Sequence, residues 1–262
     1  GFVGMLEDRG DKPDMVPVLH LSDASGAVLK VQVQNAEVFK DDLTGQLLPP
    51  DLVHAARKLE LDYFNGKQVW EKRPIGEARR VTGKPPITVR WVDVNKGDNA
   101  NPNVRSRLVA RQIRQAGEDA IFAPTPPLEA LRSILSIATT DFPGKPQHIR
   151  DGKSERRTQI SAVDISRAYF NAETDADKPT YVALPVEDPD SREMCGLLKK
   201  HMYGTRAAAD GWQQEYSGFL RSIGFRQCAA CPCLFVNAAK QLAVSVHGDD
   251  FTTAGPTCAI DW

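Results

Sequence analysis

Residues 244–255 read VSVHGDDFTTAG, and this stretch predicts a β-hairpin that carries two acidic residues at its tip. Two strand-like segments, 242–246 and 251–254, flank the turn, as expected for a pair of antiparallel strands. Asp249 and Asp250 would therefore stand side by side at one end of a sheet. Because aspartate is common in turns, such a pair is weak evidence for catalysis by itself.

A third acidic residue ends another predicted strand, residues 159–164, which read QISAVD. Carboxylates on adjacent strands can converge on two divalent ions, as phosphoryl transfer requires. One ion lowers the pKa of the attacking hydroxyl, and the other neutralises the leaving pyrophosphate. Magnesium prefers a few carboxylates and keeps water and phosphate as its remaining ligands. Asp164, Asp249 and Asp250 are therefore candidates for a two-metal site.

Helices and further strands are predicted around these acidic residues. Apolar residues recur at helical spacing in segments 52–63, 128–138 and 212–223. In the first of these helices, Asp51 is the expected N-cap and Gly66 the expected stop, and one face carries Leu52, Ala56, Leu59 and Tyr63. Strands are expected at residues 28–33, 85–94, 107–110 and 233–236. The polar segment 95–103, NKGDNANPN, joins the second and third of these strands into a hairpin, and residues 141–158 form a charged connector.

The bulk composition is that of a globular protein with a real core. The chain has 262 residues, of which 41% are hydrophobic and 26% are charged. No run of 18 apolar residues occurs, which predicts no membrane span, and the N-terminus lacks the apolar segment of a signal peptide. It also lacks an initiator Met, so a fragment of a longer polypeptide is expected.

The five cysteines are an odd number, which argues against a complete disulfide framework and favours a reducing compartment over secretion. Cys228, Cys231 and Cys233 form a tight cluster that is compatible with zinc. However, no second cysteine pair lies at finger spacing, and the nearest histidine, His247, belongs to the acidic hairpin. Zinc is therefore the less favoured interpretation.

The net charge of −1 argues against a nucleic-acid partner, but the distribution of charge favours one. Residues 72–114 contain eleven Lys or Arg and only three acidic residues. A basic segment in a neutral chain suits a surface that binds phosphate groups. The alternative is a solvated basic face without a partner, and it fits the charge equally well.

Taken in order, the motifs resemble those of reverse transcriptases from copia-type retrotransposons. VDISRAYFNAE at residues 163–173 is similar to polymerase motif A, and the acidic hairpin at 244–255 is similar to motif C. Between them, residues 197–236 resemble the long copia-type signature. Earlier segments with counterparts in the family are VWEKRP (69–74), RSRLVARQ (105–112) and FAPTPPLEALRSILSIA (122–138).

This resemblance implies an α+β fold, a right-hand polymerase with fingers and palm. The palm would be a ferredoxin-like split βαβ sheet with antiparallel strands and packed helices. The chain would divide into an N-terminal extension (1–50), the fingers with the start of the palm (51–158) and the palm with the catalytic aspartates (159–262). The family's thumb and RNase H segments have no expected counterpart in the chain.

The resemblance also assigns roles at the acidic site. Asp164, Asp249 and Asp250 would be the catalytic metal ligands, with the backbone carbonyl of Ile165 near one ion. Two Mg²⁺ ions are expected, with Mn²⁺ as the alternative. Tyr169 would lie beneath the sugar of the incoming nucleotide and exclude ribonucleotides; the alternative is a simple core aromatic.

Other residues would contact the triphosphate and the primer. The basic residues expected to bind the nucleotide are Lys96, Arg105, Arg107 and Arg206. For those of the fingers hairpin, the alternative is an ordinary solvated strand. His247 and Gly248 would lie on the primer side of the site.

Two departures from the family pattern bear on activity. Motif C commonly reads Tyr-Val-Asp-Asp, whereas here His247 and Gly248 precede the acidic pair, so His247 is expected to replace the aromatic residue in packing. The family's Lys-Gln-Ala-Pro segment is replaced by RAAA at residues 206–209. Because Ala207 has no side-chain amide, a hydrogen bond to the incoming nucleotide would be lost.

The expected activity is RNA- or DNA-templated DNA synthesis, in which a primer 3′-hydroxyl attacks the α-phosphate of a dNTP. Expected partners are template–primer, dNTPs and the integrase and RNase H segments of one polyprotein, without a membrane. The expected location is the cytoplasm, in a retrotransposon particle, or the nucleus. The alternative is a truncated or decayed relic that binds nucleic acid weakly without catalysis; Ala207 favours it and the intact aspartates oppose it.

Overall fold

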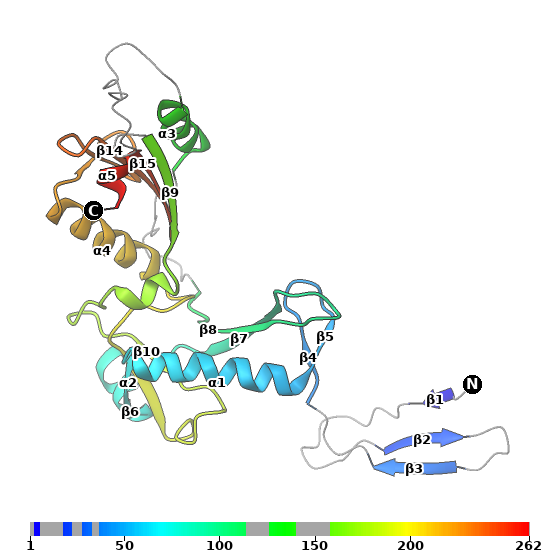
Figure 1. Ribbon diagram of the computed structural model, residues 1–262. Helices are drawn as coiled ribbons and strands as arrows, with labels where there is room; N and C mark the ends of the chain where they lie inside the picture. The colour runs from blue at the N-terminus through cyan, green and yellow to red at the C-terminus, as the bar shows by residue number, and fades with distance from the viewer. Residues whose placement is uncertain are drawn as a thin grey trace. The chain divides into compact units, whose positions relative to one another are not determined.

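The computed structural model describes residues 3–5, 18–22, 28–32, 37–113, 126–139 and 158–261 (Figure 1). The chain divides into two compact units, Gly1–Leu59 with Val92–Arg107 and Glu60–Trp91 with Leu108–Trp262. It passes from one unit to the other inside helix α1 (Pro50–Gly66) and inside strands β7 (Val89–Asn95) and β8 (Val104–Ala110). The division at residues 50 and 158 that the family resemblance implies stays a prediction.

The first unit contains small antiparallel sheets. One is formed by β1 (Val3–Met5), β2 (Val18–Ser22) and β3 (Val28–Gln32). Another is formed by β4 (Phe39–Lys40) and β5 (Leu47–Leu48). The outer part of the β7–β8 hairpin also belongs to this unit. The strand expected at residues 28–33 and the hairpin around residues 95–103 are thus confirmed.

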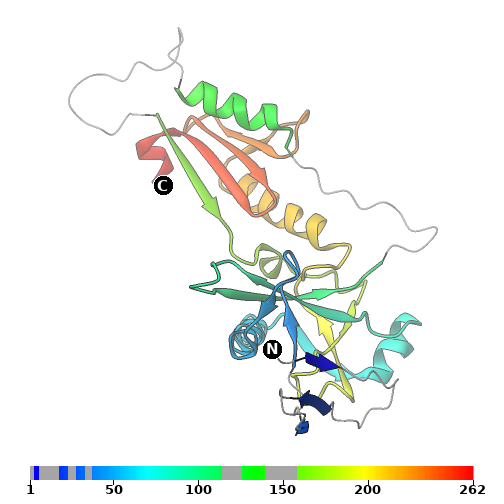
Figure 2. The same ribbon diagram turned by 90° about the vertical axis from the view of Figure 1, so that its right-hand side faces the viewer.

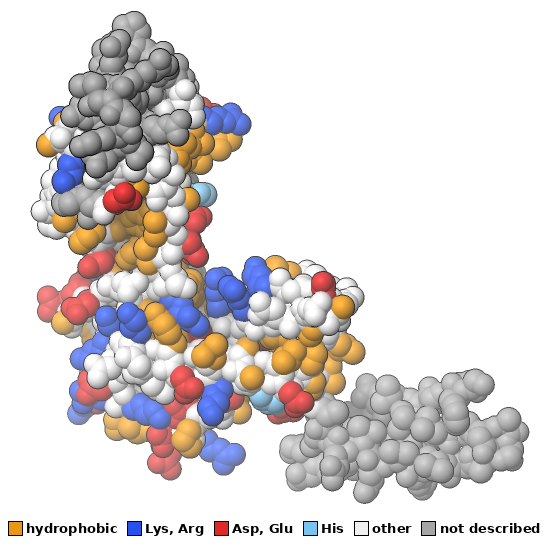
Figure 3. All heavy atoms as spheres, viewed as in Figure 1, with side chains coloured by type: hydrophobic (Ala, Val, Ile, Leu, Met, Phe, Trp, Pro, Cys, Tyr) orange, Lys and Arg blue, Asp and Glu red, His pale blue; other side chains and the backbone are white. Residues whose placement is uncertain are grey.

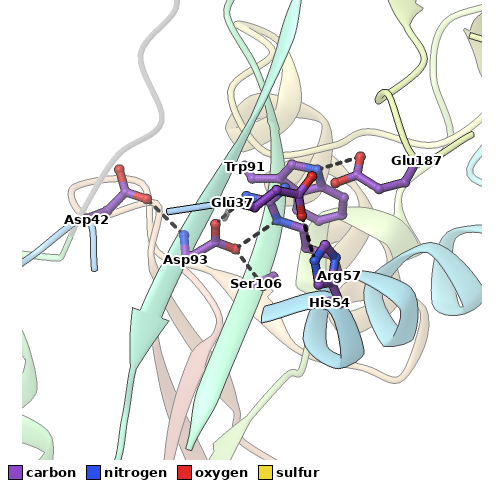
Figure 4. Close-up of polar contacts among 8 residues, drawn as sticks. All are labelled: Glu37, Asp42, His54, Arg57, Trp91, Asp93, Ser106 and Glu187. Carbon is purple, nitrogen blue, oxygen red and sulfur yellow. Dashed lines mark hydrogen bonds and ion pairs between the residues drawn. The ribbon is translucent and has the colours of Figure 1, made fainter. Parts of the chain in front are cut away.

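A buried carboxylate connects a helix and two strands in this unit. Asp93 on β7 is 5% exposed, and Arg57 of α1 donates to it through Nη2 at 2.7 Å. Ser106 of β8 donates its hydroxyl to the same carboxylate at 2.6 Å (Figure 4). A buried charge is tolerated only where such partners replace the lost water. Asp93 is therefore a structural residue of the first unit.

Helix α1 ends at Gly66 as predicted but begins earlier than expected. It starts at Pro50, because the fixed φ and missing N–H of proline suit the first helical position. Asp51 therefore lies within the first turn, and its predicted role as N-cap is wrong.

The buried face of α1 also differs from the predicted one. Leu52 and Leu59 are 37% and 65% exposed, whereas Val53, Glu60 and Phe64 are fully buried. The sequence pattern misses this face because one of its members is a glutamate, which is almost never fully buried unless it is paired. Apolar spacing alone consequently predicts the adjacent helix face, which contains Leu52 and Leu59, as the buried one.

The second unit is built on an antiparallel five-stranded sheet in the order β12-β13-β14-β15-β9. Its strands are β12 (Arg226–Gln227), β13 (Leu234–Asn237), β14 (Leu242–His247), β15 (Asp250–Pro256) and β9 (Thr158–Asp164). Helix α3 (Leu128–Thr139) covers one face and helix α4 (Ala208–Ser222) the other (Figure 2). Helices packed on antiparallel strands confirm the α+β class.

Alternation along β14 explains why both faces of this sheet are covered. Successive strand residues point to opposite faces. Val244 and Val246 belong to the core formed with Trp212 of α4, while Ala243 packs against the core that contains Ile134 of α3. The strand thus buries large apolar side chains on one face and a small one on the other.

A further three-stranded sheet in this unit escaped prediction. It contains β10 (Tyr181–Ala183), β11 (Met194–Leu198) and β6 (Trp70–Pro74), and α2 (Ile75–Thr82) follows β6. Strand β6 reads WEKRP, in which only Trp70 is buried, so its pattern is too short and too polar to indicate a strand. Two short elements complete the unit, the 3-10 helix η2 (Ala168–Asn171) and helix α5 (Thr257–Ile260).

Two segments considered in the sequence lie wholly or partly outside the described residues. The predicted connector at residues 141–158 lies outside the described residues except for Thr158, as do residues 122–125 of the family segment before α3. Among the described residues, none of the helices combines the length and the hydropathy that a membrane span requires.

Candidate active site

The β14–β15 hairpin turns in two residues, Gly248 and Asp249. His247 pairs with Asp250 across the strands, so the turn closes directly at the acidic pair. Gly248 has a φ of 66°, in the left-handed region where a side chain is strained. Two-residue hairpin loops with a positive φ at the first position favour glycine there. The predicted hairpin is confirmed, and the glycine before the acidic residues has a backbone reason.

Strand β9 brings the third acidic residue alongside. Asp164 lies directly opposite Asp250 in the register of β9 and β15. The N–H of Ile165 donates to the carbonyl oxygen of Asp249 at 2.9 Å, which continues the pairing one step beyond the strand. Opposite residues of an antiparallel pair have Cα atoms about 4.5–5.5 Å apart and side chains on the same face. Asp164 and Asp250 therefore share a face, with Asp249 at the adjoining turn.

Helix α4 fixes the turn of this hairpin. Trp212 donates its indole N–H to the carbonyl oxygen of Gly248 at 2.8 Å. The indole also packs edge-to-face on Phe251, with ring centroids 6.3 Å apart. Because Trp212 is only 7% exposed, this hydrogen bond is shielded from competing water. The acidic turn is thus anchored by a residue 36 positions earlier in the sequence.

The three carboxylates remain available to a ligand. Asp164 and Asp250 are exposed and Asp249 is half-buried, and within the described residues none of their side chains forms a hydrogen bond or ion pair. The same residues contain no group of three or more His, Cys, Asp or Glu side chains gathered to hold a metal ion. Carboxylate oxygens are nevertheless the donors that Mg²⁺ prefers. Since like charges repel, a cation would be needed to draw the three together.

Tyr169 lies close to these carboxylates. It is half-buried in η2, and its ring packs edge-to-face on Tyr203 with centroids 4.9 Å apart. Burial, reinforced by the negative charge of Asp249, raises the pKa of Tyr169 above its usual value. The phenol therefore stays protonated at neutral pH, beside the acidic turn. Its neighbour Phe170 is fully buried in the core.

The predicted basic residues belong to different units. Lys96, Arg105 and Arg107 are exposed on the outer part of the β7–β8 hairpin in the first unit, whereas Arg206 is half-buried in the second. Exposed Lys and Arg side chains are spread over the visible face of the described residues (Figure 3). The contact of these four residues with a nucleotide stays a prediction.

The loop before α4 is shaped by a close backbone approach. Gly204 has a φ of 80°, and a Cβ there would lie 1.9 Å from the carbonyl oxygen of Ala110. The backbone N–H of Arg206 donates to the side-chain Oε1 of Gln112 at 2.8 Å. Ala207 is the N-cap of α4 and contributes no side-chain cap. Sequence reasoning did not identify Gln112, since its partner lies 94 positions away.

Within the described residues, the cysteine cluster does not form a group placed to hold a metal ion. Cys228, Cys231 and Cys233 are free thiols, and Cys233 is buried. Burial, with a smaller effect of nearby Cys231, raises the pKa of Cys233 to about 11. The backbone of the cluster belongs to the β12–β13 turn, where the N–H of Cys228 donates to the carbonyl oxygen of Leu234 at 2.8 Å and the carbonyl oxygen of Cys231 accepts the N–H of Leu234 at 2.9 Å.

Comparison with known protein families identifies the family of the chain. The family model described as reverse transcriptase (RNA-dependent DNA polymerase) matches residues 79–260, which is more than half of the chain. The chain belongs to the reverse transcriptase family. The match contains β9, α4 and the β14–β15 hairpin, so every predicted aspartate ligand lies within it.

The curated relatives of this reverse transcriptase domain are transposon polyproteins. The retrovirus-related Pol polyprotein from transposon TNT 1-94 of Nicotiana tabacum is 23% identical over 183 residues, or 66% of this chain. Those from transposons RE2 and RE1 of Arabidopsis thaliana are 23% and 25% identical over 80% and 64% of it. The resemblance to copia-type elements is confirmed. The chain spans only 11% to 14% of the length of these relatives.

Proposed function

We propose that this reverse transcriptase domain is a template-directed DNA polymerase that adds dNTPs to a primer 3′-hydroxyl on an RNA or DNA template. One observation carries the proposal: Asp164 and Asp250 lie opposite one another in the β9–β15 register, and the Ile165 N–H bonds the Asp249 carbonyl. Two segments far apart in the sequence thus place three acidic residues at one sheet end, and within the described residues their carboxylates form no hydrogen bond or ion pair.

In this proposal the five-stranded sheet with α3 and α4 forms the palm, with the split βαβ topology of ferredoxin-like folds. The β7–β8 hairpin belongs to the fingers, and residues 1–50 are an extension. The antiparallel order and the helices on both sheet faces support the assignment of the palm. The exposed basic residues of β8 support that of the fingers.

Asp164, Asp249 and Asp250 would hold two Mg²⁺ ions, or Mn²⁺, with the Ile165 carbonyl near one of them. Bound there, the ions would activate the primer hydroxyl and neutralise the leaving pyrophosphate. The chain contributes the rigidity of the site, because Trp212 anchors the turn and the β9–β15 pairing fixes the two strands.

The remaining site residues would position the substrates. Tyr169 would pack under the deoxyribose and leave no volume for a 2′-hydroxyl. His247 and Gly248 would lie beside the primer end. The basic residues proposed to neutralise the triphosphate are Lys96, Arg105, Arg107 and Arg206. We further propose that the domain works within a Pol polyprotein, beside integrase and RNase H segments, in a cytoplasmic or nuclear retrotransposon particle.

The second candidate is a relic that binds nucleic acid weakly and catalyses nothing. Ala207 favours it, since this position lacks the side-chain amide of the family pattern and offers α4 no cap. Primer extension with poly(rA)/oligo(dT), dTTP and Mg²⁺ or Mn²⁺ separates the two candidates. Extension that needs the cation supports the polymerase. A folded chain that binds template–primer but extends it with neither ion is the relic.

A further inference from the structure

A buried carboxylate on α1 binds the turn that follows β9. Glu60 is 1% exposed, and both Nε and Nη2 of Arg167 lie 2.8 Å from its Oε2. The Arg167 guanidinium also lies 4.2 Å from the ring centroid of Tyr63, one helical turn beyond Glu60. Two residues of one helix thus bind the same arginine, Glu60 by an ion pair and Tyr63 by a cation–π contact.

Arg167 stands at a strained point of the backbone. Its φ of 51° and ψ of 48° are in the left-handed region, which is uncommon for a residue other than glycine. It is also the N-cap of η2, and its carbonyl accepts the N–H of Phe170 at 3.0 Å. Strained residues persist only where their surroundings fix them. Here the surroundings are the side chains of Glu60 and Tyr63.

This turn lies between two residues of the candidate site. Asp164 ends β9, and Tyr169 is the second residue of η2, so the chain passes through Arg167 on its way from one to the other. Any other conformation at Arg167 would redirect η2 and move the Tyr169 ring. The backbone that leads to that ring is consequently linked to α1, more than a hundred positions earlier in the sequence.

We propose that Glu60 and Arg167 form a positioning pair that holds Tyr169 in place and thereby sets the discrimination between deoxy- and ribonucleotides. This inference rests on the proposed polymerase function. Stability alone does not explain the pair, because replacing a buried ion pair by apolar residues is often neutral or stabilising. The pair is therefore expected to act on the geometry of η2 more than on the stability of the fold.

The first test measures amide hydrogen exchange in the 262-residue chain and needs no activity. Glu60→Gln keeps size and an acceptor but removes the charge. The double variant Glu60→Met/Arg167→Gly removes both charges, and glycine accepts the left-handed φ without strain. Exchange at the N–H groups of Phe170 and Ala172 should rise about tenfold or more, while exchange within α4 is unchanged. Unchanged exchange in η2, or an equal rise in α4, overturns the proposal.

A matched control and a kinetic test complete the experiment. Arg57→Gln breaks the ion pair with Asp93 in the first unit and should leave exchange in η2 unaltered. In primer extension, the ratio of kcat/KM for dTTP to that for UTP should fall about tenfold in Glu60→Gln and stay at the wild-type value in Arg57→Gln. An unchanged ratio with both rates lowered shows a structural pair only. If the wild-type chain incorporates no dTTP, the proposed function fails, and the exchange result still decides the role of the pair.

Discussion

The β14–β15 and β7–β8 hairpins each carry an aspartate at the tip, yet the two aspartates are used in opposite ways. At the β7–β8 tip, Asp98 accepts the N–H groups of Ala100 and Asn101 at 2.8 and 2.6 Å. At the β14–β15 tip, only the backbone of Asp249 is bonded, and its carboxylate has no hydrogen-bond or ion-pair partner within the described residues. The first aspartate shapes its own loop, whereas the second leaves its charge available to a ligand.

The two turns also differ in where their supports come from. The side-chain oxygen of Asn95 accepts the N–H groups of Gly97 and Asn103 at 3.0 and 2.8 Å, so the β7–β8 tip is fixed within nine residues of chain. The acidic turn is fixed by Trp212 and Ile165, which lie in other elements. A turn that is anchored from outside can keep its own side chains free for chemistry.

The largest effect is expected from Asp249→Asn, which removes one charge from the acidic turn and keeps its shape. If Asp249 binds a metal ion directly, the rate of dNTP incorporation should fall by about a thousandfold or more, with template–primer binding nearly intact. The control is Asp98→Asn in the other hairpin, which should leave the rate close to wild type. Retention of more than about a tenth of the activity by Asp249→Asn would contradict the metal-ligand assignment.

Tyr169→Val extends the comparison to the turn beside the acidic hairpin. Removing the ring should open space for a 2′-hydroxyl, so relative ribonucleotide incorporation should rise about ten- to a hundredfold, or about 1.4 to 3 kcal/mol. The measurement is the ratio of kcat/KM for dNTP and rNTP. Tyr169→Phe keeps the ring and should keep the ratio. An unchanged ratio in Tyr169→Val, with both rates lowered, would reduce Tyr169 to a core residue.

The two turn glycines should respond differently to alanine. A Cβ at Gly97 would lie 2.1 Å from the carbonyl oxygen of Asn101, so Gly97→Ala should destabilise the tip by about 2 kcal/mol. Gly248 has nothing within 4 Å of such a Cβ, and only its φ opposes alanine, at about 1 kcal/mol. Amide exchange in each hairpin measures both. Equal losses would show that steric contact is not what separates the two turns.

The smallest expected effect is on the free energy of unfolding at acidic pH, through His201 near the Trp212 anchor of the acidic turn. His201 is 8% exposed and packs so closely on Gly211, beside Trp212, that a Cβ at Gly211 would lie 2.1 Å from its Nε2. Burial lowers the pKa of His201, although the charge of Asp210 partly opposes this. The unfolded chain therefore binds a proton near pH 6.5 that the folded chain takes up only at lower pH.

The stability contributed by neutral His201 is complete above pH 6.5 and declines as pH falls below it, by at most about 1.4 kcal/mol per pH unit. His201→Gln should remove this part of the pH dependence, as measured by urea unfolding between about pH 7 and 5. Identical slopes in the wild type and the variant would show that burial does not lower the pKa of His201 in the folded state.

The elements that the sequence predicts are those whose information is local. The acidic hairpin, the strand ending at Asp164 and the polar β7–β8 turn follow from alternation and turn residues, and all three are confirmed. Strands β6, β10 and β11 were not predicted, because these strands of three to five residues show no regular alternation of buried and exposed side chains. Glycine and asparagine at turns are informative since they restrict φ within a few residues.

The buried face of α1 marks where sequence reasoning fails. Glu60 occupies a fully buried position that the apolar pattern assigns to neither face, and the reason lies in Arg167. A charged residue becomes a core residue only when its partner is brought to it by the fold. Gln112 escaped for the same reason, because its contact with the Arg206 backbone joins segments far apart in the chain.

The sequence by itself determined which residue types stand at the acidic hairpin, the order of the family motifs and the local turns, because each depends on a few neighbouring residues. Tertiary structure alone decided the β9–β15 register that sets Asp164 opposite Asp250, and the anchoring of the turn by Trp212. It also decided which aspartates bond their own loop and which leave their carboxylates exposed. Pairing between distant segments is selected by the burial of both sheet faces together, and no local pattern contains that condition.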